Sequence, residues 1–220
     1  MTAVAELTDT NASSIDAVVP AAGTKRAAVV RGPGVVEVAL VPVPEPKSNE
    51  VRVRIEGCGV CASNVPPWEG REWFKYPLAP GQLGHEAWGR IDAVGANVRR
   101  FKVGQRVGIL SNNAYAEYDV APEDQAVALP ASLDRLPFPA EPLGCAMNIF
   151  RRSDIRAGQT VAIVGIGFLG ALLTRLAADA GARVIAVARR PFALDLARSM
   201  GAHEVVPMDD HWNVINRAPP

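Results

Sequence analysis

The chain has 220 residues, enough for one large domain or two modest ones. Its 23 basic and 23 acidic residues cancel, so no excess of positive charge predicts a nucleic-acid partner or electrostatic binding to a membrane surface. No apolar run reaches the roughly 18–20 residues that cross a bilayer, and three cysteines are too few for a disulfide framework, so we expect a cytoplasmic protein.

The N-terminal stretch is polar and differs from the rest of the chain. It lacks the basic start and apolar centre of a signal peptide. It also carries too little apolar mass to order itself. We therefore expect residues 1–24 to form a disordered tail in front of a β-rich domain at residues 25–140.

From Lys25 to about Pro130 the chain consists of short valine-rich segments separated by Gly and Pro. Residues 27–44 predict two strands around a Gly-Pro-Gly turn, and residues 50–60 alternate with period two. The pattern continues at residues 89–98, 104–110, 114–121 and 125–130. Regularly spaced short strands with turn signals favour an antiparallel barrel or sandwich.

After a proline-bearing, loop-like segment at residues 131–140, longer helices alternate with apolar strands. Helices are predicted at residues 142–155, 168–181 and 191–201, and strands at 161–165, 183–188 and 204–207. The last five of these elements follow the order βαβαβ, the first half of a doubly wound parallel sheet. We expect residues 141–220 to form this partial dinucleotide-binding domain. Asp209-Asp210 could cap one further helix at residues 211–217.

A glycine loop follows the first strand of that domain, with the pattern Gly165-x-Gly167-x-x-Gly170. The first glycine permits a tight turn, the second lets a pyrophosphate approach the backbone, and the third lets the helix pack closely on the strand. Phe168 and Leu169 complete the helix N-terminus, whose free N–H groups attract phosphates. We predict that these five residues bind a dinucleotide; an ordinary βα turn without a ligand is the alternative.

Two segments of the β-rich half contain metal-binding residue types, residues 57–64 and 80–89. Cys61, His85 and Glu86 would suit Zn²⁺ as residue types, although a lone histidine is more often structural. Cys58-x-x-Cys61 could also start a metal knuckle, but a four-cysteine site needs a second pair, which the chain lacks.

The sequence resembles the medium-chain, zinc-dependent alcohol and polyol dehydrogenases over about residues 25–216. GHEAWGRIDAVGANVRRFKVGQRV resembles the zinc-site signature of that family, CGVCASN its first-ligand loop, and EPLGCAMNIF its interdomain helix. The resemblance implies a GroES-like antiparallel β-barrel domain followed by an incomplete Rossmann (βαβαβ) domain. In the family, the catalytic zinc lies in the cleft between the two domains.

The resemblance also implies roles for individual residues. Cys61 and His85 match the first two zinc ligands, and Glu86 matches the acidic residue that follows that histidine. Glu141 matches a position that supplies a further carboxylate directly or through water, although it could instead cap the helix that follows. Ser63 matches the hydroxyl that passes the substrate proton toward solvent. The predicted metal set is therefore Cys61, His85, Glu86 and Glu141, and the predicted catalytic set is Ser63, His85 and Cys61.

The chain departs from the family pattern at three places. Asn64 stands where an aspartate usually orients the zinc ligands, and an amide cannot provide the same charge. Pro66 stands where a relay histidine is found in other members. Residues 108–113 leave no room for a four-cysteine lobe, so we expect one catalytic zinc and no structural zinc.

The second strand of the Rossmann half ends in Ala188-Arg189-Arg190, where NAD enzymes carry an acidic residue for the ribose 2′-hydroxyl. Without the carboxylate a 2′-phosphate is not repelled, and guanidinium groups can bind it. We predict a preference for NADP(H) over NAD(H); the alternative is that both arginines are solvated surface charges.

The predicted reaction is hydride transfer between a small-molecule alcohol or carbonyl substrate and a nicotinamide cofactor. A truncated, non-catalytic binding or scaffold module is an alternative, as is a fragment of a longer dehydrogenase. An open sheet edge would favour association, so a homo-oligomer is compatible with the sequence. Trp68, Trp73 and Phe74 either line an apolar pocket or pack the barrel.

Overall fold

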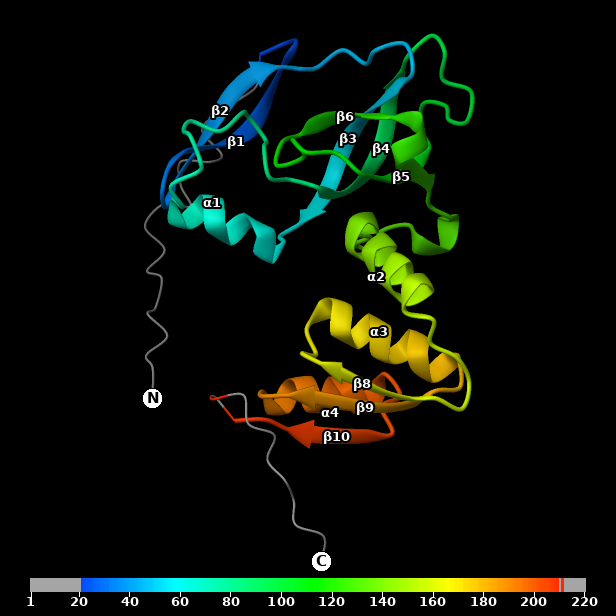
Figure 1. The fold of residues 1–220 in the computed structure, drawn as a ribbon. Coiled ribbons are helices and arrows are strands. Elements are labelled where there is room, and N and C mark those ends of the chain that lie inside the picture. Colours follow the sequence, from blue (N-terminus) through cyan, green and yellow to red (C-terminus); the bar gives the residue numbers. More distant parts are fainter. Residues whose placement is uncertain (1–20, 210, 212–220) are drawn as a thin grey trace, which may run out of the picture. The chain divides into compact units, whose positions relative to one another are not determined.

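The computed structural model describes residues 21–209 and 211 (Figure 1). The chain divides into two compact units, one ending at Glu141 and the other beginning at Pro142. Residues 1–20 of the predicted tail, Asp210 and residues 212–217 of the last predicted helix lie outside the described residues. None of the described helices has both the length and the apolar composition needed to cross a bilayer.

The first unit is built from antiparallel strands (Figure 1). One sheet pairs β1 with β2, and a second, five-stranded sheet has the order β6-β3-β4-β5-β7. The strands are β1 (Thr24–Gly32), β2 (Val35–Pro42), β3 (Glu50–Gly59), β4 (Glu86–Val94), β5 (Arg106–Ile109), β6 (Tyr118–Pro122) and β7 (Ala126–Ala128). Each strand expected in this half is present, so the antiparallel β domain is confirmed; β1 begins one residue inside the predicted tail.

Alternation in β3 explains how the sequence builds this core. Val51 and Val53 have no exposed surface, whereas Arg54, the next residue of β3, is exposed to solvent. Because side chains alternate across a strand, one face of β3 is apolar and packs with Ile91 of β4 and Ile109 of β5. Burying each such side chain stabilises the fold by about 1.5–3 kcal/mol.

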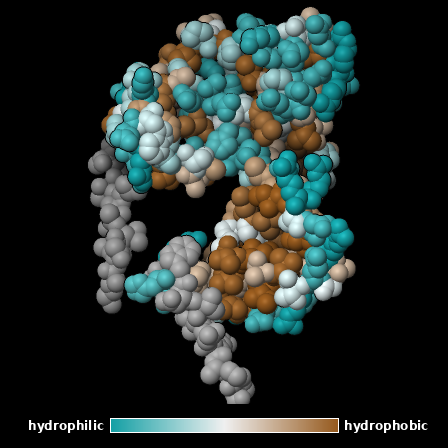
Figure 2. All heavy atoms as spheres, viewed as in Figure 1, coloured by the Kyte–Doolittle hydropathy of each residue, from teal (hydrophilic) through white to brown (hydrophobic). Residues whose placement is uncertain are grey.

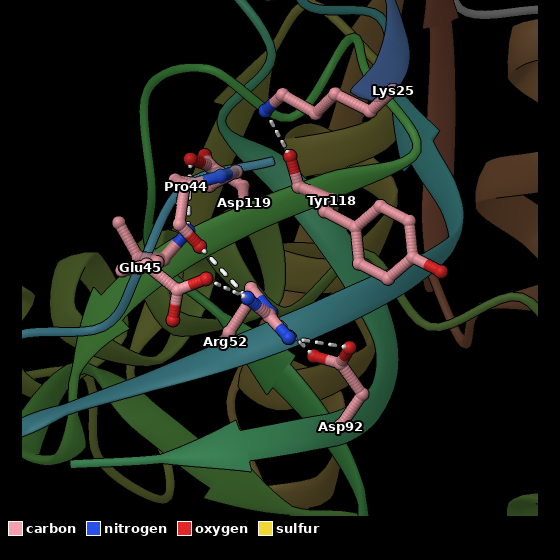
Figure 3. Close-up of polar contacts among 8 residues, drawn as sticks. Lys25, Pro44, Glu45, Arg52, Asp92, Tyr118 and Asp119 are labelled. Atoms are coloured by element: carbon pink, nitrogen blue, oxygen red, sulfur yellow. Dashed lines mark hydrogen bonds and ion pairs between the residues drawn. The ribbon is translucent and has the colours of Figure 1, made fainter. Parts of the chain in front are cut away.

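Charged side chains link these strands (Figure 3). Arg52 of β3 donates to the two carboxylate oxygens of Asp92 in β4, at 3.0 and 3.2 Å. Lys25 of β1 is buried and donates to the main-chain carbonyl of Tyr118 in β6, which ties the two sheets together. Burial lowers the pKa of Lys25, and the nearby Asp119 carboxylate opposes that shift.

Short helical segments complete the first unit: η2 (Ala62–Asn64), α1 (Val65–Glu69), η3 (Glu123–Gln125) and η4 (Ala131–Leu133). α1 ends at Gly70, whose φ of +79° is readily adopted only by glycine. The N–H of Gly34, in the turn between β1 and β2, donates to the carbonyl of Trp68 at 2.9 Å. This bond holds α1 beside the β1–β2 hairpin (Figure 1).

The second unit contains a parallel sheet of the order β10-β9-β8. Its elements are β8 (Thr160–Val164), α3 (Phe168–Asp179), β9 (Arg183–Ala188), α4 (Pro191–Ser199) and β10 (Glu204–Pro207). The predicted βαβαβ order is confirmed. α2 (Ala140–Ser153) precedes it and spans the division between the units, so the boundary expected at residue 141 falls inside a helix.

Small residues let the helices of this unit lie close to the sheet. Ala177 of α3 and Ala197 of α4 have no exposed surface. Large apolar side chains remain exposed in the same unit, including Val164 at 62% and Phe168 at 55%. Figure 2 shows hydrophobic residues gathered on the visible face of this unit. Among the described strands, β8 is an edge of the parallel sheet.

Candidate functional site

Three of the predicted metal ligands lie together at one end of the β3–β4 pair. Cys61 follows β3 and starts η2, while His85 and Glu86 lead into β4. The two strands pair in antiparallel register, with Gly59 opposite Glu86, so the end of one strand lies beside the start of the other. One ligand atom from each of Cys61, His85 and Glu86 lies within 4.8 Å of the others. This geometry brings a thiol, an imidazole and a carboxylate into one group.

A backbone carbonyl orients the ring of His85. Nδ1 of His85 lies 2.8 Å from the carbonyl oxygen of Leu83. Because a carbonyl only accepts hydrogen bonds, the contact requires a proton on Nδ1 and leaves Nε2 as the nitrogen available to a metal. Leu83 has a φ of +83°, a conformation that costs a non-glycine residue roughly 1–2 kcal/mol. The strained residue therefore supplies the carbonyl that fixes His85.

Asn64 connects that carbonyl to Cys61. Its side-chain Oδ1 accepts hydrogen bonds from the main-chain N–H of Cys61, at 3.2 Å, and from the hydroxyl of Tyr115, at 2.7 Å. Its Nδ2 donates to the carbonyl of Leu83 at 3.2 Å. A carboxylate at this position could accept the first two bonds but could not donate the third. The amide, which departs from the family pattern, therefore matches a site in which His85 is held by a carbonyl.

Hydrogen bonds favour the ionised form of Cys61. Bonds from the side chain and backbone of Ser63 lower the pKa of the Cys61 thiol, burial opposes the shift, and a bond to His85 adds to it. Burial alone would lower the pKa of His85, but its bonds to Cys61 and to the Leu83 carbonyl raise it. The thiolate is the form of cysteine that can bind a metal, and these contacts favour it.

Glu86 is buried, at 8% exposure, and lies directly over Gly59. A Cβ at residue 59 would stand 2.0 Å from Oε2 of Glu86. Only glycine therefore leaves room for this carboxylate at its present position. The glycine-rich motif around Cys58 was a signal for this close approach, but the sequence did not identify which side chain would use the space.

The other residues considered as ligands lie differently. Cys58 packs against the hydrophobic core, and burial raises the pKa of its thiol to about 11. Glu141, in the first turn of α2, is not in the group of three, although its charge contributes to the raised pKa of His85. Ser63 is exposed and contacts Cys61. Sequence reasoning missed Leu83 and Tyr115, since neither residue type at its position carries a signal.

We predict that Asn64→Asp destabilises the fold by about 1–3 kcal/mol, because the carbonyl of Leu83 loses a donor and faces a carboxylate. Tyr115→Phe removes a hydroxyl that lies 2.7 Å from Oδ1 of Asn64 and 3.1 Å from the carbonyl oxygen of Gly59. Because its one proton serves one acceptor at a time, the change should cost only about 1 kcal/mol. Urea unfolding of the metal-free chain measures both. Equal stability of Asn64→Asp and the parent chain would show that the bond to Leu83 contributes nothing.

The glycine loop of the second unit has the shape that the motif predicts. Gly165 has a φ of +91°, so the tight turn needs a residue without a side chain. A Cβ on Gly167, which caps α3, would meet nothing within 4 Å, so the space beside this backbone is open. A Cβ on Gly170 would lie 2.1 Å from the carbonyl oxygen of Gly165. Phe168 and Leu169 begin α3 and are exposed.

The arginine pair lies beside this loop. A pocket of about 200 Å³ is lined by residues of the glycine loop, of the end of β9 and the turn after it, of α4 and of the segment after β10. They are Gly165, Ile166, Gly167, Ala188, Arg189, Arg190, Ala193 and Met208. The structure thus places both arginines at the same pocket as two of the three motif glycines. A dinucleotide seated on the loop would have its ribose within reach of guanidinium groups.

We predict that Gly170→Ala destabilises the second unit by about 1–3 kcal/mol, because α3 must move away from the carbonyl of Gly165. Gly144→Ala is the matched control. A Cβ at residue 144, inside α2, meets nothing within 4 Å, so this change should stabilise the helix by about 0.5–1 kcal/mol. Thermal unfolding of both variants checks the difference, and a fully stable Gly170→Ala chain would contradict it.

Comparison with known proteins agrees with this arrangement. Residues 47–131 match the alcohol dehydrogenase GroES-like domain. An alcohol dehydrogenase of Aspergillus sp. (strain MF297-2) is 32% identical over 198 residues, which cover 75% of this chain and 57% of that protein. The chain therefore spans little more than half the length of this curated relative.

Solved structures give the same result. Galactitol-1-phosphate dehydrogenase from Escherichia coli superposes with a TM-score of 0.69 at 28% identity, covering 82% of this chain and 60% of that one. A structure from Sinorhizobium meliloti 1021, assigned as a zinc-binding dehydrogenase and bound to NADP, superposes with a TM-score of 0.73 at 30% identity, covering 84% and 62%. The chain is therefore a relative of the medium-chain, zinc-type alcohol and polyol dehydrogenases, and it contains their GroES-like domain and part of their Rossmann-like domain.

Proposed function

We propose that the chain belongs to a zinc-dependent oxidoreductase that transfers a hydride between an alcohol or carbonyl substrate and NADP(H). The observation that carries the proposal is the group of Cys61, His85 and Glu86, whose ligand atoms lie within 4.8 Å of one another. This group lies within residues 47–131, the segment of this chain that matches the alcohol dehydrogenase GroES-like domain. Oxidoreduction is thus the chemistry that the relatives and the donor set both support.

The donor set suits zinc. Thiolate, imidazole and carboxylate are the ligands that Zn²⁺ takes in catalytic sites with an open position. Cys61, His85 and Glu86 would hold the ion, and Glu141 would approach it directly or through water. When bound, zinc supplies Lewis-acid chemistry that favours the deprotonated form of an alcohol. We propose one catalytic zinc and no structural zinc.

Ser63 would move the proton of the alcohol toward solvent. Its side chain is exposed and it hydrogen-bonds to Cys61, so one hydroxyl contacts both the metal group and water. A hydroxyl can accept one proton while donating another, which is what a relay requires. Ser63→Ala should therefore slow turnover by about 10²–10⁴-fold without loss of zinc.

The glycine loop and the arginine pair would hold the cofactor. Gly165, Gly167 and Gly170, with Phe168 and Leu169, would present the N-terminus of α3 to the pyrophosphate. Arg189 and Arg190 line the same pocket and would bind a 2′-phosphate. The NADP-bound relative supports this assignment.

We expect the double variant Arg189→Ala, Arg190→Ala to bind NADPH at least about 10-fold more weakly, since loss of a single hydrogen bond to a charged group costs about 1.5–3 kcal/mol. NADH affinity should change little. Arg151→Ala, Arg152→Ala is the matched control, because it removes the same charge from exposed positions at the end of α2. A double variant with unchanged NADPH affinity would contradict the proposed role.

The proposed activity is tested by following NADPH formation when the full chain, loaded with zinc, is given NADP and primary alcohols. We expect turnover that is lost on zinc removal and restored on re-addition. Turnover that persists after complete removal of zinc would contradict the proposal, as would a folded, zinc-loaded, NADPH-binding chain that converts no alcohol or carbonyl compound.

A second candidate function is a binding module whose sheet associates with another chain. The observation that favours it is β8, an edge strand of the described sheet, with Val164 exposed at 62%. Association of two copies through this edge would give a homo-oligomer. Sedimentation of the purified chain checks this, and a monomer at high concentration would argue against it. We place the protein in the cytoplasm, where its three cysteines would stay reduced.

A further inference from the structure

The first unit contains a second feature beside the metal group, an apolar cavity of about 360 Å³. This volume lies within the range of about 300–1,000 Å³ that small-molecule pockets occupy. Its walls come from β1, β2, η2, α1 and the segments that carry Leu83 and Tyr115. The lining residues are Ala28, Val30, Val36, Val60, Cys61, Asn64, Val65, Trp68, Gln82, Leu83 and Tyr115.

The cavity and the metal group meet at one residue. Cys61 belongs to both. Asn64 and Leu83, which hold Cys61 and His85 through hydrogen bonds, also line the cavity. A molecule in this cavity therefore lies against Cys61, one of the proposed zinc ligands.

The walls offer a ligand no carboxylate and no cationic side chain. None of the lining residues is Asp, Glu, Lys, Arg or His. The side chain of Asn64 is occupied by three hydrogen bonds, and the hydroxyl of Tyr115 donates to Asn64 at 2.7 Å. Oε1 of Gln82 accepts from the N–H of Ala79 at 2.8 Å. Few polar partners therefore remain for a bound molecule, so burying its polar groups here would be unfavourable.

Large apolar side chains are exposed around the cavity. Val36, Val60, Val65 and Trp68 are between 46% and 82% exposed. Of the three aromatic residues that the sequence singled out, Trp68 lines the cavity, whereas Trp73 and Phe74 do not and lie with their ring centroids 6.1 Å apart. A cluster of exposed apolar side chains around a cavity is typical of a ligand site.

We propose that this cavity binds the uncharged alkyl or aryl group of the substrate, so that the alcohols used by this protein carry an apolar chain and no phosphate. The inference rests on the proposed function and names its substrate class. A phosphorylated polyol such as that of the Escherichia coli relative would need a cationic side chain for its phosphate, and the cavity has none.

Calorimetric titration of the full, zinc-loaded chain with 1-butanol, 1-hexanol and 1-octanol tests the proposal without any need for turnover. We expect Kd to fall by about four-fold for each added methylene, as burial of apolar surface requires. Val65→Asp should abolish this dependence. Val103→Asp is the control, since Val103 is 59% exposed and does not line the cavity. A Kd that is independent of chain length, or tighter binding of sorbitol 6-phosphate than of 1-octanol, would overturn the proposal.

Alkylation of Cys61 in the metal-free chain locates the bound alcohol. We expect 1-octanol to slow the reaction of iodoacetamide with Cys61 and to leave the rate at Cys145, in α2, unchanged. Equal rates at Cys61 with and without saturating 1-octanol would overturn the proposal. Both measurements are independent of hydride transfer: a chain that shows protection but no turnover refutes only the proposed activity. A chain that oxidises alcohols with no preference for long ones refutes only the substrate class.

Discussion

Replacing His85 with alanine is expected to lower the affinity of the chain for zinc by more than about 100-fold. Removing a residue that only hydrogen-bonds to a metal ligand lowers metal affinity by about 10–100-fold, and loss of a ligand itself should cost more. His85 contributes the nitrogen of the group, and its ring is already oriented by the bond between Nδ1 and the carbonyl of Leu83. Without it, two donors remain in the group, a thiol and a carboxylate. Three protein ligands are the usual minimum for a catalytic zinc site.

Competition with a chromogenic chelator at equilibrium measures this affinity in both proteins. His211→Ala is the matched control, because His211 is exposed and far along the chain from the metal group. Circular dichroism should show that the variant stays folded, since His85 makes one side-chain bond to the backbone and is not part of the hydrophobic core. Retention of one zinc per chain with unchanged affinity in His85→Ala would rule out this group as the metal site.

Arg106→Met is expected to destabilise the first unit by about 2–5 kcal/mol, because two main-chain carbonyls and the Glu56 carboxylate lose a charged donor. The side chain of Arg106, in β5, is 3% exposed and donates to Glu56 at 2.7 Å. Its two terminal nitrogens donate to the carbonyls of Leu133 and Leu136, at 2.6 and 2.7 Å. Methionine fills the space but leaves these oxygens without their donor.

Arg90→Met provides the comparison, since Arg90 pairs with the same Glu56 at 3.2 Å but is 41% exposed. An exposed pair contributes about 0–1 kcal/mol, so this variant should unfold at nearly the same urea concentration as the parent chain. Arg90 also pairs with Asp134, at 3.3 Å, so the two arginines each have several partners and differ mainly in burial. Equal midpoints for the two variants would contradict the account.

The strands and helices could be predicted because each depends on neighbours in the sequence. Alternating valines mark β3, and Pro191 and Gly201 delimit α4. The three motif glycines behave as their spacing predicts, because the turn, the open backbone and the close helix contact are local requirements of a βα unit. Local patterns therefore determine most of the fold.

The support of the metal group could not be predicted in this way. Asn64 is 19 residues from Leu83 and 51 residues from Tyr115 along the chain, so the three residues and their partners meet only through tertiary folding. No propensity places a leucine at a φ of +83°, since this conformation is favoured only where the surroundings impose it. The resemblance brought Cys61, His85 and Glu86 to attention, whereas the reason for the amide at residue 64 required the structure.

The burial of two charged side chains could likewise not be predicted from the sequence pattern. Lys25 and Arg106 lie in strands and would be expected to face solvent, yet both are 5% exposed. Each is buried because carbonyl groups from distant segments, such as those of Tyr118 and Leu133, surround its charge. Only the three-dimensional arrangement supplies those partners.

The most direct test of the central claim, that the chain holds a working nicotinamide site of a zinc dehydrogenase, is a fluorescence titration of the purified chain with NADPH and, for comparison, NADH. We expect saturable binding that favours NADPH and is weakened in the Arg189→Ala, Arg190→Ala variant. A chain that is demonstrably folded and binds neither nucleotide would contradict the claim, and equal affinity for NADPH and NADH would contradict the role of the two arginines.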